Sequence, residues 1–574
     1  MRVCLVSSVN LGGWYDRERE PTILSLPLGL LSLAAVLEQS GHEVAILDFN
    51  YALAKGELSL DGDFYANAAK RIEAARPQVV GFSTMCNSYH IALRMAEAVR
   101  AGLPLVPIVF GGPQASVVDR ETLEVFSFVD MVLRGESEQT LPLLLAGLER
   151  GIIPQELPGL TYRDRDRVVR NSNTPLLIDL DSLPVPAYHL FPYGVAGAPA
   201  IDVGRGCPFA CTFCSTSGFW GRRFRLKSID RIVQEMWMLK KEYGATCFSL
   251  MHDLFTVNRK RLHEFCARLQ LEKMDVTWTC SARVDCVDAE LLRHMADSGC
   301  RAVFYGVESG SARMQREIGK NLRLDQVWSA VDGTLAADMS TTLSFIAGFP
   351  RETEDDLRQS MVAIQSLIER PQVNVQMHLL APQTGTLDYH RYGGSLAFDG
   401  YYSDIADAAC RFLEPEWFRQ SPALFSSFYY FQTPDAPRTL LRGLDLFVHG
   451  PCSVMRETVL NLLKGTSNLW QLYREWRVWA DGRCRGGGPI AGQNPDEFLL
   501  DFYDFASERV KAGHEDFDLG RSRDEILAFY LQYYGQTPVR FVKSTTADTP
   551  APPAENMEVT HGVHDSGLDA RLRM

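Results

Sequence analysis

Along the chain, short hydrophobic runs typical of buried strands alternate with amphipathic stretches typical of helices. In residues 1–150, short β-branched runs predict buried parallel strands at 2–7, 43–48, 78–83, 107–111 and 131–134. Amphipathic stretches, such as 28–39 and 90–101, separate several of these runs and predict helices. Strand–helix alternation at this spacing is typical of a doubly wound, Rossmann-like α/β domain, which we predict over residues 1–150.

The alternation of predicted strands and helices resumes after residue 195, with more residues between successive strands. Strands are predicted at 200–204, 246–252, 276–282, 302–307, 341–347 and 373–380. Helices are predicted between them at 229–242, 259–270, 289–296, 324–337 and 354–369. Six consecutive βα units predict a partial (β/α)6 barrel of the TIM type over residues 196–400, with its active site at the carboxyl ends of the strands.

The other segments have different patterns. Residues 151–195 are rich in Pro, Asp and Arg and predict a hairpin and linker. Residues 401–543 contain aromatic-rich helical stretches, at 439–463 and 467–480, and predict a helical C-terminal domain. The tryptophans of these stretches are expected to belong to its core. Residues 544–574 have few aromatic residues and are expected to be disordered.

Length, net charge and cysteine content limit the classes of protein to which the chain can belong. A chain of 574 residues exceeds the roughly 250–300 residues at which single cores stop growing, so several domains are expected. The net charge of −13 encodes no long-range attraction to nucleic acid or anionic lipid. The sequence opens directly on a strand pattern, and no apolar run is long enough to span a bilayer. Thirteen scattered cysteines do not make a disulfide scaffold, and we expect a reducing, cytoplasmic compartment.

One cysteine motif carries specific chemistry. Cys207, Cys211 and Cys214 follow the first predicted barrel strand and are separated by three and then two residues. Thiolates are the soft ligands that iron–sulfur clusters require, and three of them leave one iron of a 4Fe–4S cluster open. The alternative, a structural zinc site, needs four closed ligands. The next Cys and His, Cys247 and His252, fall within a predicted strand, so the sequence favours the cluster.

This motif, with an aromatic residue before the last cysteine, resembles the radical S-adenosylmethionine enzymes over residues 196–400. The resemblance implies that the open iron chelates S-adenosylmethionine and that reductive cleavage yields a 5′-deoxyadenosyl radical. It also implies cosubstrate contacts at the ends of successive strands. The implied contacts are Phe213, Ile346 and Gly348 for adenine, Asp253 for the amino group, Arg283 for the carboxylate, Ser281 beside it, and Glu308 for the ribose or methionine.

Each of these residues could instead have a purely structural role. Asp253 departs from the usual Gly-Gly-Glu form of its motif and could cap a helix. Arg283 and Glu308 could pair with one another, and the glycines could only make turns.

The N-terminal domain resembles that of the cobalamin-binding subclass of this family. The similar segments are 27–33, 41–44, 111–113 and 135–138. The implied corrinoid contacts lie beyond the carboxyl ends of the strands, at Ser83, Thr84, Gly111, Gly112 and Glu136. The Asp-x-His-x-x-Gly motif that supplies an axial histidine is absent after the first strand. His42 and His90 are the other candidates, and neither is well placed, so we expect cobalamin without a histidine ligand from the protein. A Rossmann-type domain that binds another ligand is the alternative.

The resemblance implies methylation of an unactivated carbon in a small molecule, lipid or peptide, with an electron donor such as flavodoxin or ferredoxin. Radical cyclisation or rearrangement without methyl transfer is the second possibility, and a corrinoid-binding redox module that is not an enzyme is the third. A methylthiotransferase is disfavoured, because residues 1–150 contain only Cys4 and Cys86, whereas a second cluster there would need three cysteines.

Overall fold

The structure is a computed structural model, which describes residues 1–9, 26–191, 199–400, 414–483, 495–512 and 519–534. The chain divides into a large unit, Met1–Ile526, and a small one, Leu527–Met574. Of the small unit, only the last part of helix α22 (Leu519–Tyr534) is described. The tail predicted to be disordered, 544–574, lies outside the described residues.

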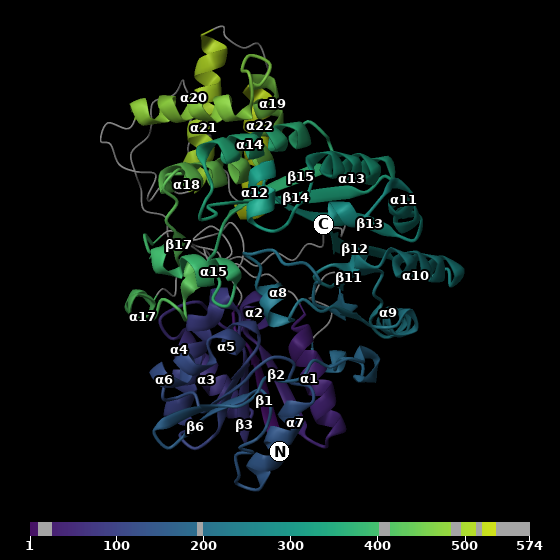
Figure 1. Cartoon of the computed structure of the whole chain (residues 1–574), viewed down its shortest axis with the longest axis vertical. Helices are drawn as coiled ribbons and strands as arrows, with labels where there is room; N and C mark the ends of the chain where they lie inside the picture. The colour runs from purple at the N-terminus through teal and green to yellow at the C-terminus, as the bar shows by residue number, and fades with distance from the viewer. Residues whose placement is uncertain (10–25, 192–198, 401–413, 484–494, 513–518, 535–574) are drawn as a thin grey trace, which may run out of the picture. The chain divides into compact units, whose positions relative to one another are not determined.

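A seven-stranded sheet forms the N-terminal part, in the order β2-β1-β3-β4-β5-β6-β7 (Figure 1). The parallel strands are β1 (Arg2–Ser7), β2 (Glu43–Asp48), β3 (Val79–Ser83), β4 (Ile108–Gly111) and β5 (Met131–Leu133). An antiparallel hairpin, β6 (Leu160–Asp164) and β7 (Arg167–Arg170), extends the sheet at β5. The strand order reverses between β1 and β3, and ligands bind doubly wound sheets at such a switch point.

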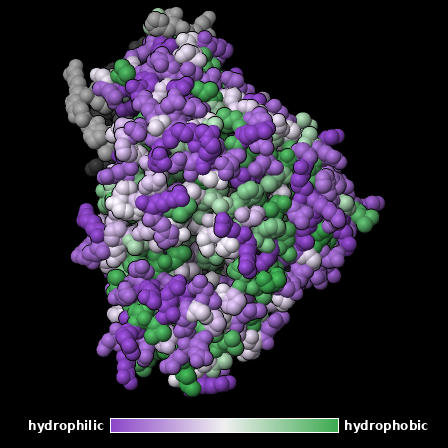
Figure 2. Space-filling model, viewed as in Figure 1, coloured by the Kyte–Doolittle hydropathy of each residue, from purple (hydrophilic) through white to green (hydrophobic). Residues whose placement is uncertain are grey.

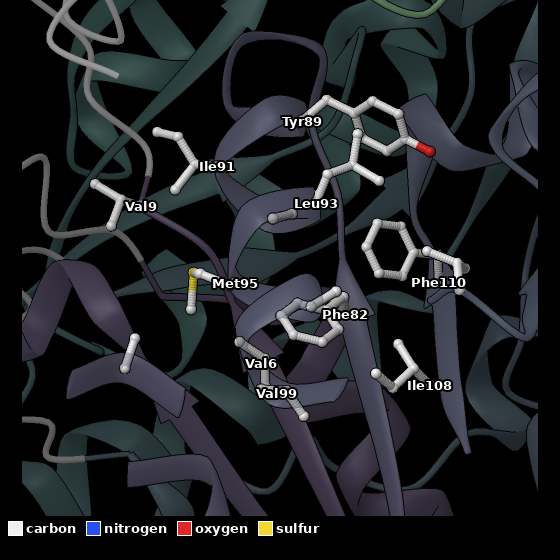
Figure 3. Close-up of a cluster of buried hydrophobic side chains, with 14 of the residues drawn as sticks. Val6, Val9, Phe82, Tyr89, Ile91, Leu93, Met95, Val99, Ile108 and Phe110 are labelled. Atoms are coloured by element: carbon white, nitrogen blue, oxygen red, sulfur yellow. The ribbon is translucent and has the colours of Figure 1, made fainter. Parts of the chain in front are cut away.

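Helices cover both faces of this sheet. They are α1 (Leu28–Gln39), α2 (Phe49–Ala54), α3 (Phe64–Ala74), α4 (Tyr89–Gly102), α5 (Pro113–Val117), α6 (Asp119–Val125) and α7 (Thr140–Glu149). Because successive strand residues point to opposite faces, Phe82 packs with α3 and α4, whereas Val79 packs with α1 and α7. Figure 3 shows the first of these cores, where Phe82 and Phe110 lie beside Leu93 and Met95 of α4.

A later segment of the chain completes the same core. Phe418 and Phe428 pack with α4, although they follow the barrel in sequence. Phe418 lies in α17 (Pro415–Gln420) and Phe428 in the short helix η9 (Ser426–Phe428). Arg94 of α4 pairs with Glu414 at 2.6 Å, which fixes the start of this segment on the N-terminal sheet.

Six parallel strands form the second sheet, in the order β15-β14-β13-β12-β11-β8. They are β8 (Ala200–Asp202), β11 (Cys247–Met251), β12 (Thr277–Ala282), β13 (Cys300–Glu308), β14 (Ser340–Ala347) and β15 (Val373–Leu379). The connecting helices are α9 (Ile229–Tyr243), α10 (Arg259–Leu271), α11 (Ala289–Asp297), α13 (Leu324–Ala336) and α14 (Glu354–Ile368). Because β8 and β15 are the two ends of the sheet, the barrel is open, as the six predicted βα units imply.

Local sequence explains where the barrel helices begin. The side chains of Ser228, Asn258, Asp288 and Thr353 each accept a hydrogen bond from the first turn of the helix that follows. The strands alternate between fully buried apolar residues and partly exposed residues. The partly exposed positions, which include Ser281 and Ile346, therefore face away from the helices and line the interior of the barrel.

The C-terminal helices are α18 (Arg438–Phe447), α19 (Arg456–Leu462), α20 (Leu469–Arg483), α21 (Pro495–Lys511) and α22. The stretch 439–463, predicted to be helical throughout, is interrupted by a π-helical turn, η10 (Val448–Cys452). Pro451 lies in this turn and has no N–H to continue the helical bonding. Trp476 is 1% exposed and stacks on Phe447, which confirms that the tryptophan stripe belongs largely to the core.

The described helices include none that is both long and apolar enough to cross a membrane. On the face of the molecule in Figure 2, hydrophobic residues are interspersed with hydrophilic ones.

Candidate functional site

The three cysteines of the motif lie on one loop at the carboxyl edge of the barrel sheet. The loop begins after β8 and the two-residue strand β9 (Gly204–Arg205) and ends at helix α8 (Ser215–Phe219). Cys207, Cys211 and Cys214 are free thiols and are partly exposed. We refer to residues 206–214 as the cluster loop.

Three separate elements anchor the cluster loop through hydrogen bonds. The amide of Gly206 donates to Asp253, after β11, at 3.0 Å. The amide of Thr212 donates to the carbonyl of Ile318 at 2.9 Å, and its hydroxyl donates to Asp388 of α15 (Leu387–Tyr392) at 3.0 Å. These contacts fix both halves of the loop on the barrel. Asp388 lies 176 residues from Thr212 in the chain, and no sequence signal identified it.

The donor set fits an iron–sulfur cluster. In the part of the chain that the structure describes, no three His, Cys, Asp or Glu side chains are close enough to chelate one metal ion. A cluster does not need such closeness, because each thiolate binds a different iron. Burial raises the pKa of Cys211 to about 11, while the nearby cations Lys320 and Arg283 oppose this shift. The two cations would stabilise the thiolate that ligation requires.

Arg283, the residue after β12, lies directly beside the cluster loop. Its guanidinium group stacks on the ring of Phe209 at 3.7 Å. It also forms two hydrogen bonds with the carboxylate of Asp285, at 3.0 and 2.9 Å. Arg283 therefore has a carboxylate partner in the protein, and that partner is not Glu308.

Glu308, the last residue of β13, pairs instead with Lys320. The ammonium nitrogen of Lys320 lies 2.6 Å from Oε1 of Glu308, and both residues are buried. Glu308 has a φ of +69°, a left-handed conformation that is uncommon for a residue other than glycine. Such backbone strain is often found at functional sites. Lys320 lies beyond helix α12 (Ala312–Glu317), and no sequence signal marked it as part of this site.

The structure brings together the residues predicted to contact adenine. Phe213 of the cluster loop packs edge to face on Phe349, with ring centroids 5.5 Å apart, and Ile346 joins the same apolar cluster. Gly348, with a φ of +99°, donates its amide to Oε2 of Glu352 at 2.6 Å. Glu352 is fully buried, and this burial raises its pKa to about 8. The result is an apolar surface that meets a backbone turn, which suits an aromatic base.

Asp253 and Ser281 also lie at this edge of the barrel. Asp253 is exposed, and besides Gly206 it accepts a hydrogen bond from the hydroxyl of Thr216 at 3.2 Å. Ser281 is partly exposed on the interior face of β12. Asp253 thus anchors the cluster loop and still presents a carboxylate to solvent.

At the carboxyl edge of the N-terminal sheet, the predicted corrinoid contacts form a compact turn. The hydroxyl of Thr84 donates to the carbonyl of Gly111 at 2.8 Å and accepts the amide of Ala115 at 3.0 Å. Gly112 has a φ of +91°, and a Cβ atom there would lie 2.8 Å from the backbone of Thr84. Ser83 ends β3 beside this turn. This turn is therefore built from small residues, which allows a bulky, flat cofactor to approach its backbone.

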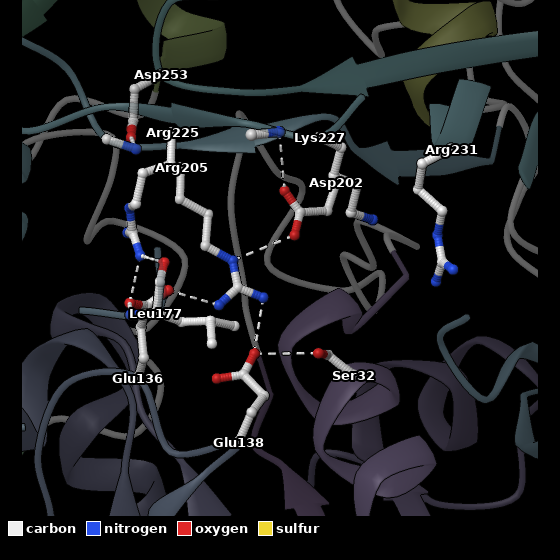
Figure 4. A network of polar contacts seen from close by, with 12 residues as sticks. Ser32, Glu136, Glu138, Leu177, Asp202, Arg205, Arg225, Lys227, Arg231 and Asp253 are labelled. Carbon is white, nitrogen blue, oxygen red and sulfur yellow. Dashed lines mark hydrogen bonds and ion pairs between the residues drawn. The ribbon is translucent and has the colours of Figure 1, made fainter. Parts of the chain in front are cut away.

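Glu136 and Glu138 follow β5 at the same edge, and both reach toward the barrel (Figure 4). Nη1 of Arg205 lies 2.7 Å from Glu136, and its Nη2 lies 2.7 Å from Glu138. Burial alone would raise the pKa of Glu138, but the charge and hydrogen bond of Arg205 outweigh it, and the pKa is lowered. Both carboxylates therefore have partners within the protein.

Neither of the two histidines in residues 1–150 is exposed at the sheet edge where the corrinoid is predicted to bind. His42 precedes β2, at the amino edge of the sheet, and lies 3.1 Å from the N-terminal amine. His90 is fully buried, with Phe418 and Phe428 edge-on to its ring.

Comparisons with known proteins agree with this geometry. Residues 201–364 match the radical SAM superfamily and residues 24–145 match the B12 binding domain. The chain is 32% identical to the uncharacterized methyltransferase PH0819 of Pyrococcus horikoshii over 340 residues, which are 58% of this chain and 72% of that protein. It is 27% identical to the anaerobic magnesium-protoporphyrin IX monomethyl ester cyclase of Synechocystis over 374 residues, which are 63% and 72% of the two chains.

A solved structure shares the fold. The cobalamin-dependent S-adenosylmethionine radical enzyme OxsB, with aqua-cobalamin bound, matches with a TM-score of 0.62 and 15% identity over 95% of this chain and 81% of OxsB. The cofactors that the two matched domains imply are cobalamin for the first and a 4Fe–4S cluster with S-adenosylmethionine for the second. This protein belongs to the cobalamin-dependent radical S-adenosylmethionine enzymes.

Proposed function

We propose that this enzyme methylates an unactivated carbon of a metabolite, lipid or peptide. One observation carries the proposal: Arg205, two residues before Cys207, pairs with two carboxylates at the edge where cobalamin would bind. The methyl carrier and the source of the radical would therefore face the same substrate. When bound, the cluster supplies the electron that cleaves S-adenosylmethionine, and cobalamin carries the methyl group. The relative PH0819, which is named a methyltransferase, supports this choice.

The proposed roles of the residues follow from their contacts. Cys207, Cys211 and Cys214 would hold the cluster. Phe213, Ile346 and Gly348 would enclose the adenine in the apolar cluster that Phe349 completes. The remaining polar residues would hold the methionine and ribose portions of the cosubstrate: Asp253, Ser281, Arg283 and Glu308.

The corrinoid would lie on the carboxyl edge of the N-terminal sheet, against Ser83, Thr84, Gly111 and Gly112. Their tight turn allows close approach to the backbone. Glu136 lies at the same edge, where its carboxylate is held by arginine side chains.

A second candidate function is radical cyclisation without methyl transfer, which the similarity to the Synechocystis cyclase favours. The third, a corrinoid-binding redox module, would not cleave S-adenosylmethionine. For either enzyme we propose an electron donor of the flavodoxin or ferredoxin type. We also propose a cytoplasmic location, because every cysteine that the structure describes is a free thiol and such clusters need reducing conditions.

The test begins with anaerobic purification and reconstitution with iron, sulfide and methylcobalamin. S-adenosylmethionine and a strong reductant are then added, and 5′-deoxyadenosine and S-adenosylhomocysteine are quantified. The methylase is expected to form both products. Cys211→Ala should lose the cluster absorbance and 5′-deoxyadenosine, whereas Cys247→Ala, a partly exposed cysteine outside the loop, should retain both.

The other outcomes separate the alternatives. Formation of 5′-deoxyadenosine alone, with each substrate class supplied, would favour cyclisation. Formation of neither product by a protein with a full cluster and bound cobalamin would support the binding module.

A further inference from the structure

A largely buried network of charges joins the edge of the N-terminal sheet to the cluster loop (Figure 4). Arg205 uses all three of its guanidinium nitrogens, each toward a different carboxylate. Nη1 pairs with Glu136, Nη2 with Glu138, and Nε with Asp202 at 3.2 Å. The side chains of Glu136 and Glu138 are 4% and 7% exposed. Only a planar, forked cation can satisfy three carboxylates in this way.

A second arginine strengthens the network from the neighbouring strand. Arg225, in β10 (Arg225–Leu226), is directly opposite Arg205 in the antiparallel pair β9–β10. Its Nη1 lies 2.6 Å from Oε2 of Glu136, so that the two oxygens of this carboxylate contact different arginines. Glu138, in turn, accepts a hydrogen bond from Ser32 of α1 at 3.0 Å.

Hydrogen bonds, an ion pair and short stretches of backbone link the proposed corrinoid edge to the proposed cluster ligands. The hydroxyl of Ser116 donates to the carbonyl of Gly112 at 2.8 Å and accepts the amide of Gly135 at 3.0 Å. Gly135 directly precedes Glu136, which holds Arg205. Arg205 is followed by Gly206, whose amide donates to Asp253, and Gly206 directly precedes Cys207. A displacement at Gly112 would therefore reach Cys207 through partly buried hydrogen bonds and the ion pair of Glu136 with Arg205.

We propose that Arg205 is a positioning residue that couples the two cofactor sites, so that cobalamin at the sheet edge strengthens S-adenosylmethionine binding at the cluster loop. This inference rests on the cofactor sites assigned under the proposed function. By thermodynamic linkage, S-adenosylmethionine must strengthen cobalamin binding by the same factor.

The coupling can be measured without turnover or substrate. The protein with an oxidised cluster and no corrinoid is titrated with radiolabelled S-adenosylmethionine by equilibrium dialysis, with and without saturating hydroxocobalamin. The reciprocal titration follows hydroxocobalamin absorbance. We expect about a fivefold or larger gain in each affinity, the lower end of typical allosteric coupling. A ratio of one in the wild-type protein would overturn the proposal.

The variants test the role of Arg205 itself. Arg205→Lys keeps the charge but not the fork, so each cofactor should still bind alone while the coupling ratio falls toward one. Glu138→Gln, which removes one carboxylate, should also lower the coupling ratio. If Arg205→Lys no longer binds its cofactors, the ratio measured in Glu138→Gln tests the proposal. The control is Arg94→Lys, which disturbs the contact with Glu414 and should leave the ratio unchanged.

An undiminished ratio in both network variants would refute the proposal. The result is independent of whether the enzyme methylates or cyclises, because no product is measured. A negative result here, with both products formed in the reconstitution assay, would leave the proposed function intact.

Discussion

The ammonium group of Lys320 lies 2.6 Å from the carboxylate of Glu308, and the two side chains are only 8% and 9% exposed. Removal of one partner from a buried ion pair leaves the other charge uncompensated, which costs about 3–5 kcal/mol. The pair also lies beside the cluster loop, since the charges of both residues act on Cys211. Lys320 therefore supports the site as well as the fold.

Lys320→Met should lower the free energy of unfolding and also weaken S-adenosylmethionine binding. Lys227→Met is a matched control, because Lys227 forms a similarly buried pair with Glu235, and neither residue belongs to the cluster loop. Anaerobic thermal denaturation should show a loss of stability in both variants, and equilibrium dialysis should show a loss of affinity only in Lys320→Met. Equal affinities in the two variants would restrict Lys320 to a structural role.

Substitutions at Asp253 can separate loop anchoring from cosubstrate binding. Asn can accept the amide of Gly206 with its carbonyl oxygen and donate its NH2 group to the hydroxyl of Thr216, but it carries no charge, whereas Ala makes neither bond. Charge-assisted hydrogen bonds contribute about 1.5–3 kcal/mol, so Asp253→Asn should bind S-adenosylmethionine about 10–100-fold more weakly at normal iron content. Asp253→Ala should lose iron as well. Normal affinity in Asp253→Asn would show that the carboxylate serves only as an anchor.

Gly112→Ala should impair cobalamin binding. The new Cβ atom would lie 2.8 Å from the backbone of Thr84, at a φ of +91°. Strain of this kind costs about 1–3 kcal/mol and would distort the turn where the corrinoid is proposed to bind. We expect a weaker affinity for hydroxocobalamin by absorbance titration. Gly62→Ala, where a Cβ atom would meet nothing within 4 Å, should behave as wild type.

Glu352 should make stability depend on pH. Burial raises its pKa to about 8, above the ordinary value of 4.5, so the folded protein holds a proton that the unfolded chain releases between these values. The contribution of Glu352 to stability is therefore greatest below pH 4.5 and is lost as pH rises through about 8, by up to about 1.4 kcal/mol per pH unit. Glu352→Gln should flatten this slope in denaturation measured from pH 6 to 8. The exposed neighbour Glu354, changed to Gln, should leave the slope as in wild type.

The elements of the two sheets could be predicted because their signals are local. The strand predicted at 43–48 has those bounds in the structure, and the helix predicted at 28–39 also matches. Period-two and period-3.6 patterns arise from residues that are adjacent in the chain. The three cysteines lie within eight residues, so their convergence on one loop could be inferred in the same way.

The contacts that complete the site could not be predicted, because they join distant residues. Asp388 reaches the cluster loop across 176 residues, and Arg205 meets Glu136 across 69. A lone Asp or Arg carries no sign of its partner. The aromatic residues around Phe418 likewise indicate burial but not which core receives them. The interruption at Pro451 is different, because the residue that breaks the helix was visible in the sequence.

The anchoring of the cluster loop has a consequence for chain entropy. Fixing the backbone of one residue costs about 1–2 kcal/mol, so a loop ordered only by its metal would lose much of its binding energy to this cost. Here Asp253, Ile318 and Asp388 order the loop through contacts that involve no metal. Incoming iron and sulfide thus meet a preorganised template, and the strength with which the cluster is retained depends on the surrounding barrel as much as on the three cysteines.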